Sequence, residues 1–97
     1  MDLQKMINQE NTTIVDVREP FETMFGKAKG AINISLGNIQ DRIEEFRQMS
    51  KPIIVYCRSG NRSGQATSYL RAQGIKEVYN GGSLSEVKAL LKSKANV

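Results

Sequence analysis

The sequence predicts an α/β domain, in which a small and mostly parallel sheet carries helices on both faces. Two observations lead to this fold class. Apolar, β-branched runs alternate along the chain with segments of helical apolar spacing, the order that right-handed strand–helix–strand crossovers produce. Residues 52–57 form a continuous apolar run, which is typical of a strand buried on both faces of a parallel sheet.

The length and composition are those of one ordinary globular domain. With 97 residues the chain can build a single core but not two, so we expect one domain over residues 1–97. The sequence is 39% hydrophobic and 25% charged, as in most globular proteins. It has no apolar run of membrane-spanning length and no signal-peptide pattern at its start, which predicts a cytoplasmic protein that does not contact membranes.

The first third of the chain predicts a helix, a strand and a second short helix. Residues 2–9 have helical apolar spacing, and Asp2 is placed to cap the first turn. The β-branched run at 12–17 predicts a strand. Pro20 suits a first helical position, and the short helix that it begins ends at Gly26. The apolar face of this helix consists of Phe21, Met24 and Phe25.

The middle of the chain predicts a second strand and a longer helix before the central strand. Residues 31–34, Ala-Ile-Asn-Ile, follow Gly30 and predict a short strand. Asn38 can cap the next helix, which stops before Pro52. The face that this helix buries consists of Ile39, Ile43 and Phe46.

The last third predicts a helix, a strand, a turn and a final helix. The first of these helices follows the polar residues after Cys57 and ends at Gly74. Residues 78–79 predict a strand, and 80–82, Asn-Gly-Gly, predict a turn. Residues 83–86 have the capping-box pattern that starts the final helix. The small face of the first helix consists of Ser63, Ala66, Thr67 and Leu70.

Charge is divided unevenly along the chain. Residues 1–46 hold 5 basic and 8 acidic side chains, whereas residues 47–97 hold 9 basic and 2 acidic ones, for a net charge of +4. A positive field of this kind steers small anions or acidic partners toward a site, although solvated surface lysines explain the charge equally well. No nucleic-acid-binding motif accompanies it, so we expect no nucleic acid partner.

Cys57 is the one cysteine, and the sequence has no histidine. An internal disulfide, Cys–His or Ser–His–Asp catalysis and most zinc sites are therefore excluded, and we expect no metal and no cofactor. Cys57 stands where the central strand ends and polar residues lead into a helix, where backbone N–H groups and arginines lower the pKa of a thiol. This context favours a reactive thiol over the alternative, a cysteine that only packs at the end of a core strand.

Four segments, in order, resemble the signatures of single-domain rhodaneses. They are residues 14–20, 26–34, 54–63 and 78–82, and the likeness extends over about residues 13–92. The resemblance implies a rhodanese-like fold, consistent with the α/β prediction, and a thiosulfate sulfurtransferase activity. In this family the cysteine takes a sulfane sulfur from a small anionic donor such as thiosulfate and holds it as a persulfide. It then passes the sulfur to a thiophilic acceptor such as cyanide, a small thiol or a protein thiol.

The same resemblance assigns the residues of the site. Cys57 would be the persulfide-forming nucleophile. The loop after it would bind the donor, with its backbone amides around the outer sulfur and its two arginines attracting the anion. The loop consists of Arg58, Ser59, Gly60, Asn61 and Arg62.

Other residues match the family outside the loop or depart from it. Asp16 and Arg18 match an Asp-x-Arg strand end. They would form an ion pair that supports the loop or, as the second alternative, would contact the substrate. Glu22 matches an acidic residue that would have a structural role. Lys27 replaces the histidine that usually follows this glycine, which would change the local packing. Leu84 stands near the place of a usual tryptophan, and this second departure would alter the wall of the donor pocket.

Loop length separates sulfur transfer from the chemistry of related phosphatases. The loop of those phosphatases resembles Cys-x5-Arg, in which the arginine is six positions after the cysteine. Here Arg62 is five positions after Cys57, so phosphatase and arsenate reductase activities are disfavoured. The remaining alternative is a non-catalytic module of the same fold that binds a partner or senses oxidation. The intact cysteine loop favours the enzyme. Since the sequence has no second cysteine, an external nucleophile would have to discharge the persulfide.

Overall fold

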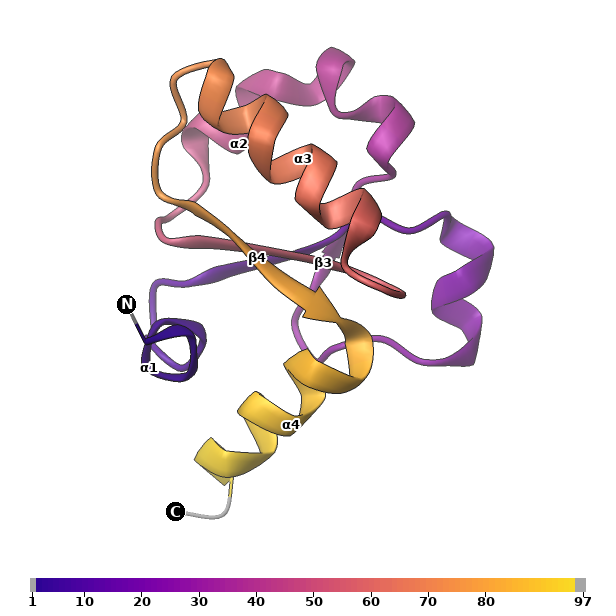
Figure 1. Ribbon diagram of the computed structural model, residues 1–97, viewed down its shortest axis with the longest axis vertical. Helices are drawn as coiled ribbons and strands as arrows, with labels where there is room; N and C mark the ends of the chain where they lie inside the picture. The colour runs from indigo at the N-terminus through magenta and orange to yellow at the C-terminus, as the bar shows by residue number, and fades with distance from the viewer. Residues whose placement is uncertain (1, 96–97) are drawn as a thin grey trace.

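A four-stranded parallel sheet forms the centre of the molecule (Figure 1). The computed structural model describes residues 2–95. The strands lie in the order β2-β1-β3-β4, and each neighbouring pair is parallel, as the alternation of elements predicts. Their bounds are Thr13–Asp16 for β1, Ile32–Asn33 for β2, Ile53–Cys57 for β3 and Val78–Ser83 for β4.

Helices cover both faces of this sheet, which confirms the predicted arrangement. α2 and α3 lie on one face, and α1 and α4 lie on the other (Figure 1). The α-helices are α1 Leu3–Ile7, α2 Ile43–Gln48, α3 Asn61–Ala72 and α4 Leu84–Ala95. Three 3-10 helices are η1 Pro20–Phe25, η2 Leu36–Asn38 and η3 Gln40–Arg42.

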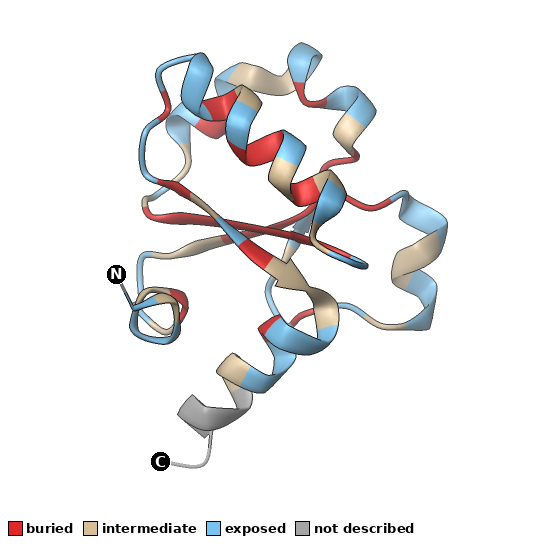
Figure 2. Cartoon of the chain, viewed as in Figure 1, coloured by how far each residue is buried: buried red, intermediate tan, exposed pale blue. Residues whose placement is uncertain are grey.

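The central strand β3 divides the core into two layers. All five of its residues are buried, so it appears continuously red in Figure 2. Because strand side chains alternate, Ile53, Val55 and Cys57 face the α2–α3 layer. Ile54 and Tyr56 face the α1–α4 layer. The side chain of Cys57 therefore lies at the carboxyl end of the strand, on the side that α3 covers.

The carboxyl ends of β1 and β3 lie next to each other. Asp16, the last residue of β1, is in register with Tyr56, the residue before Cys57. The segment that follows β1, which includes η1, therefore meets the cysteine loop at one edge of the sheet. Ligands of open α/β folds bind at this edge.

The helix predicted to start after Asn38 begins later, at Ile43. The backbone N–H groups of Asn38, Ile39 and Arg42 bind carbonyl groups three residues earlier, so residues 36–42 form the tighter 3-10 helices η2 and η3. The predicted apolar face is nevertheless correct. Its three residues are buried in the core or packed against it: Ile39, Ile43 and Phe46.

The turn predicted at residues 80–82 is also wrong, because β4 runs through this segment to Ser83. The register of β3 and β4 shifts between Val55 and Tyr56, which leaves Gly81 as the extra residue of a β-bulge. A Cβ atom on Gly81 would lie 2.8 Å from Cγ2 of Ile54. Glycine is therefore needed for close backbone packing here rather than for a change of direction.

Candidate active site

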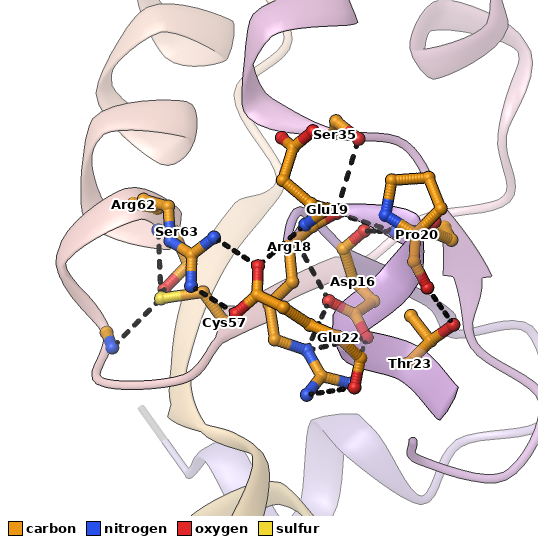
Figure 3. Close-up of polar contacts among 12 residues, drawn as sticks. Asp16, Arg18, Glu19, Pro20, Glu22, Thr23, Ser35, Cys57, Arg62 and Ser63 are labelled. Atoms are coloured by element: carbon orange, nitrogen blue, oxygen red, sulfur yellow. Dashed lines mark hydrogen bonds and ion pairs between the residues drawn. The ribbon is translucent and has the colours of Figure 1, made fainter. Parts of the chain in front are cut away.

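Cys57 is the last residue of β3, and its Sγ atom lies within the first turn of α3 (Figure 3). Sγ accepts hydrogen bonds from the backbone N–H groups of Gly60 at 3.0 Å and Ser63 at 3.5 Å. The residue is fully buried. α3 begins at Asn61, so its first turn forms the second half of the cysteine loop.

The surroundings of Cys57 shift its ionisation in two opposite directions. Burial raises the pKa of the thiol, but the Ser63 hydroxyl and the backbone N–H groups of Ser63, Ser59 and Gly60 outweigh burial and lower that pKa below its usual value. The positive end of the 12-residue helix α3 acts in the same direction. A larger fraction of Cys57 is therefore thiolate, the nucleophilic form, at neutral pH.

The hydroxyl group of Ser63 links Cys57 to β4. Its oxygen lies 3.4 Å from Sγ and donates a hydrogen bond of 2.7 Å to Oδ1 of Asn80. With a neutral thiol, S–H can donate to Ser63 while Ser63 donates to Asn80. With a thiolate, the Ser63 proton can turn to Sγ, because Asn80 Oδ1 still accepts from the N–H of Gly82 at 2.9 Å. The arrangement can therefore serve both protonation states.

Gly60 sets the curvature of the loop. Its φ of +96° is in the left-handed region that favours glycine. A Cβ atom here would lie 3.4 Å from Cα of Gly82, in the bulged strand β4. The side chain of Asn80 also donates to the carbonyl of Gly60 at 3.1 Å. The bulge in β4 therefore packs against the loop and holds the N–H of Gly60 toward Sγ.

Asp16 and Arg18 form a buried ion pair beside the loop. Nη2 of Arg18 lies 2.7 Å from Oδ2 of Asp16, with the two side chains 7% and 1% exposed. The same guanidinium donates to the carbonyl of Gly26 at 2.7 Å and, at 3.4 Å, to that of Glu22. The expected ion pair is therefore present. It contacts η1 and its C-terminal end directly.

Glu22 connects η1 to the cysteine loop. Its two carboxylate oxygens accept hydrogen bonds of 2.7 Å and 2.9 Å from the guanidinium of Arg62 (Figure 3). This bidentate pairing with Arg62 lowers the pKa of Glu22 to about 2. Arg62, which is expected to help attract an anionic donor, thus forms an ion pair with Glu22.

Arg58 is the loop arginine that remains available. It is exposed, and among the side chains that the structure describes, those of residues 2–91, none forms a hydrogen bond or ion pair with its guanidinium. Ser59 and Asn61 are exposed as well, and the Ser59 hydroxyl accepts from the N–H of Asn61 at 3.4 Å. Arg58 lines a pocket of about 460 Å³ beside the loop. The other lining residues are Arg18, Phe21, Glu22, Phe25 and Leu84.

Neither a metal-binding cluster nor a membrane-spanning helix is present in the part of the chain that the structure describes. Among residues 2–95, no group of three or more His, Cys, Asp or Glu side chains is arranged to hold a metal ion. In the same residues no helix combines the length and apolar character needed to cross a membrane.

Comparison with known proteins agrees with this geometry. The family model of the rhodanese-like domain matches residues 1–90. The chain belongs to the rhodanese-like domain family. A solved structure described as rhodanese with anions from E. coli superposes on this rhodanese-like domain with a TM-score of 0.68 at 33% identity, covering 77% of this chain and 89% of that one. The α/β fold predicted from the sequence is therefore confirmed.

Relatives of this rhodanese-like domain carry different names. The uncharacterized protein YqhL of Bacillus subtilis is 43% identical over 69% of this chain and 52% of its own length. A tRNA uridine(34) hydroxylase of Pelagibacter ubique is 32% identical over 94% of this chain and 32% of its own length. A sulfurtransferase of Allochromatium vinosum is 35% identical over 79% of this chain and 71% of its own length.

These matches cover only part of some relatives, which limits what their names imply for this domain. The chain spans about half of the YqhL relative and about a third of the hydroxylase, so a larger protein's activity does not pass to this domain with its name. The sulfurtransferase relative and the family itself support sulfur transfer in general.

Two contacts of this rhodanese-like site are not predicted from the sequence. Asn80 was assigned to a turn, yet its side chain joins Ser63 to Gly60. The pairing of Glu22 with Arg62 joins residues 40 positions apart. A usable signal for Asn80 is its position just after residues 78–79, where the sequence predicts a strand end, because parallel strands end at the same edge of the sheet. No sequence signal pointed to the second contact.

Replacing Glu22 with glutamine is expected to destabilise the domain in a pH-dependent way. The pKa of Glu22 falls from 4.5 to about 2 on folding, so its contribution to stability is present above pH 4.5 and is lost as the pH falls toward 2. Because the pair is partly exposed, we expect Glu22→Gln to cost only about 1 kcal/mol at pH 7. Urea denaturation at pH 7 and pH 3 measures the difference, which should shrink at pH 3.

The matched control is Glu45→Gln. Glu45 forms a similar pair with Arg42, but both side chains are more exposed, at 50% and 39%. We expect a smaller loss of stability for this variant. Equal losses for the two variants, or a Glu22→Gln loss that persists unchanged at pH 3, would contradict a structural role for the Glu22–Arg62 pair.

Proposed function

We propose that this domain is a sulfurtransferase that carries sulfane sulfur as a persulfide on Cys57. The observation that carries the proposal is the environment of Sγ, which accepts two backbone N–H hydrogen bonds in the first turn of α3. Such a site lowers the pKa of a thiol and stabilises negative charge on sulfur. Membership of the rhodanese-like family supports the same chemistry.

Loading would proceed by nucleophilic attack on a donor such as thiosulfate. The Cys57 thiolate attacks the sulfane sulfur, a new S–S bond forms at Sγ, and the S–S bond of thiosulfate breaks. Sulfite leaves with the bonding electron pair, so no external oxidant or reductant is needed. Arg58 is the loop cation we assign to attract the anionic donor, because Arg62 is already paired with Glu22.

In unloading, Cys57 would be the leaving group instead of the nucleophile. The nucleophilic acceptor, cyanide or a thiolate, attacks the outer sulfur of the persulfide and forms a bond to it. The bond between Sγ and the outer sulfur breaks, and Cys57 returns to the thiolate that the loop stabilises. Because Cys57 is buried, both steps require the atoms that cover Sγ to move apart.

Intact-mass measurement tests this proposal directly. Reduced protein incubated with thiosulfate is expected to gain the mass of one sulfur atom, about 32 Da, through formation of a persulfide. Cyanide should then remove the added mass and yield one equivalent of thiocyanate. No gain of mass with thiosulfate or with polysulfide would instead support the non-catalytic alternative, a module that binds a partner or senses oxidation.

A further inference from the structure

Large apolar side chains are exposed together on η1. Phe21, Met24 and Phe25 are 65%, 80% and 88% exposed, and together they are called the η1 patch here. Ile32, at 43%, is the one other large hydrophobic residue exposed to this degree among those the structure describes. Isolated exposed apolar residues are common, whereas three within five positions mark a surface that another molecule covers.

Polar contacts, rather than the core, hold η1 in place. None of its residues is buried. Glu19 and Glu22 form a capping box at its start, and Arg18 binds the carbonyl groups of Glu22 and Gly26. The Glu22 side chain is tied to Arg62. Since these bonds fix the segment, the outward-facing phenylalanine and methionine side chains are not required for its position.

The η1 patch is continuous with the pocket beside the cysteine loop. Phe21 and Phe25 line that pocket together with Leu84, which opens α4. Met24 lies outside the lining, so the apolar surface extends beyond a pocket of about 460 Å³. A small thiol in the pocket would leave Met24 uncovered. Only a larger molecule can cover the pocket mouth and the whole patch at once.

Positive charge lies at the border of this surface. Arg58 lines the pocket without an acidic partner among the described residues. Nζ of Lys88 would be 3.4 Å from a Cβ atom on Gly26, so it lies at the C-terminal end of η1. Glu22 is paired with Arg62, and the exposed Glu19 is the one carboxylate that remains on η1. Arg58 and Lys88 outnumber it, so a positive charge is left over. The charge that remains suits an acidic partner.

We propose that the η1 patch and Arg58 form the docking surface for a protein that accepts sulfur from Cys57, through a cysteine set among apolar and acidic residues. This inference rests on the proposed function. The chain has one cysteine, so the persulfide sulfur must leave on an external nucleophile. The acceptor thiolate bonds to the outer sulfur and Cys57 leaves as a thiolate, with the acceptor proton released to solvent.

Single-turnover transfer to four synthetic peptides tests the docking surface. Each seven-residue peptide has a central cysteine, flanked by either Leu or Ser and by either Glu or Lys. Protein is first loaded with thiosulfate and its persulfide confirmed by mass. Each transfer rate is then divided by that peptide's rate with a small aromatic disulfide, which removes differences in thiol reactivity. We expect the Leu–Glu peptide to exceed the Ser–Lys peptide by about 30-fold.

Variants of the protein test which exposed residues produce the preference among the peptides. Phe21→Ser/Phe25→Ser is expected to reduce the preference for Leu over Ser flanks by about 10-fold, and the milder Met24→Ser to reduce it less. Ile32→Thr is the matched control, because it alters an exposed apolar residue on β2 and should keep the preference. Circular dichroism verifies that each variant is folded.

The outcomes separate the two proposals. Failure of the protein to load with sulfur would refute the proposed function. Normal loading followed by equal rates for the four peptides, or an equal loss of preference in the Ile32→Thr control, would refute the docking surface alone. Sedimentation equilibrium tests whether a second copy of this chain, rather than an acceptor protein, covers the η1 patch. A dimer of the unmodified chain that Phe21→Ser/Phe25→Ser dissociates would assign the η1 patch to a second copy instead.

Discussion

Cys57→Ser protein is expected to gain no mass with thiosulfate and to produce thiocyanate at least about 1,000-fold more slowly than the unmodified protein. The serine hydroxyl has nearly the shape of the thiol and can accept the same N–H hydrogen bonds from Gly60 and Ser63. It remains protonated at neutral pH, however, and cannot hold a sulfane sulfur. Intact mass and a thiocyanate assay measure the two losses.

A cysteine at a different place distinguishes the site from the thiol alone. Ser68 is exposed on α3, so Cys57→Ser/Ser68→Cys restores one thiol outside the loop. This double variant is expected to remain unloaded, because its thiol lacks the N–H groups that lower the pKa of Cys57. Loading of the double variant, or thiocyanate production by Cys57→Ser itself, would show that the loop is not the source of the chemistry.

The parts of this domain that could be predicted from sequence are those with a strong local pattern. The apolar run of β3 is a central strand, and the small face of α3 is buried as expected. The capping box at the start of α4 is formed through hydrogen bonds between Ser83 and Glu86. In each case a periodic or capping pattern depends on residues only a few positions apart, so the sequence contains the information.

Features that depend on distant segments could not be predicted in this way. The extension of β4 past residue 80 depends on how Gly81 fits against Ile54, which lies on another strand. The exposure of the η1 patch depends on the polar contacts that hold η1 away from the core. Helical spacing marks Phe21 and Phe25 as one face, but it does not say whether that face meets the core or a partner.

Arg18→Met is expected to destabilise the domain by about 3–5 kcal/mol, because it leaves the carboxylate of Asp16 buried without its charged partner. Methionine replaces much of the arginine stem, so loss of packing contributes little. A domain of this size is stabilised by about 5–15 kcal/mol in total, so the variant would lose a large share of its stability. Urea denaturation at 25 °C measures the loss.

Arg71→Met is the matched control, because it removes an arginine that makes carbonyl and aromatic-ring contacts but no ion pair with a described carboxylate. Arg71 donates to the carbonyl of Val78 and lies over the ring of Tyr79 at 5.2 Å, much as Arg18 binds carbonyl groups and lies 5.8 Å from the ring of Tyr56. It has no carboxylate partner among the described residues, so we expect a loss of about 1 kcal/mol. Equal losses would assign the cost to carbonyl and ring contacts.

The same substitution links the buried ion pair to the docking surface. Arg18 also holds the C-terminal end of η1 through the carbonyl group of Gly26, so its removal releases the segment that presents the η1 patch. At a temperature where Arg18→Met is still folded, sulfur transfer to the Leu–Glu peptide should therefore fall more than transfer to cyanide, which needs no docking. A proportional loss with both acceptors would mean that Arg18 contributes to stability without positioning the surface on which acceptor proteins are proposed to dock.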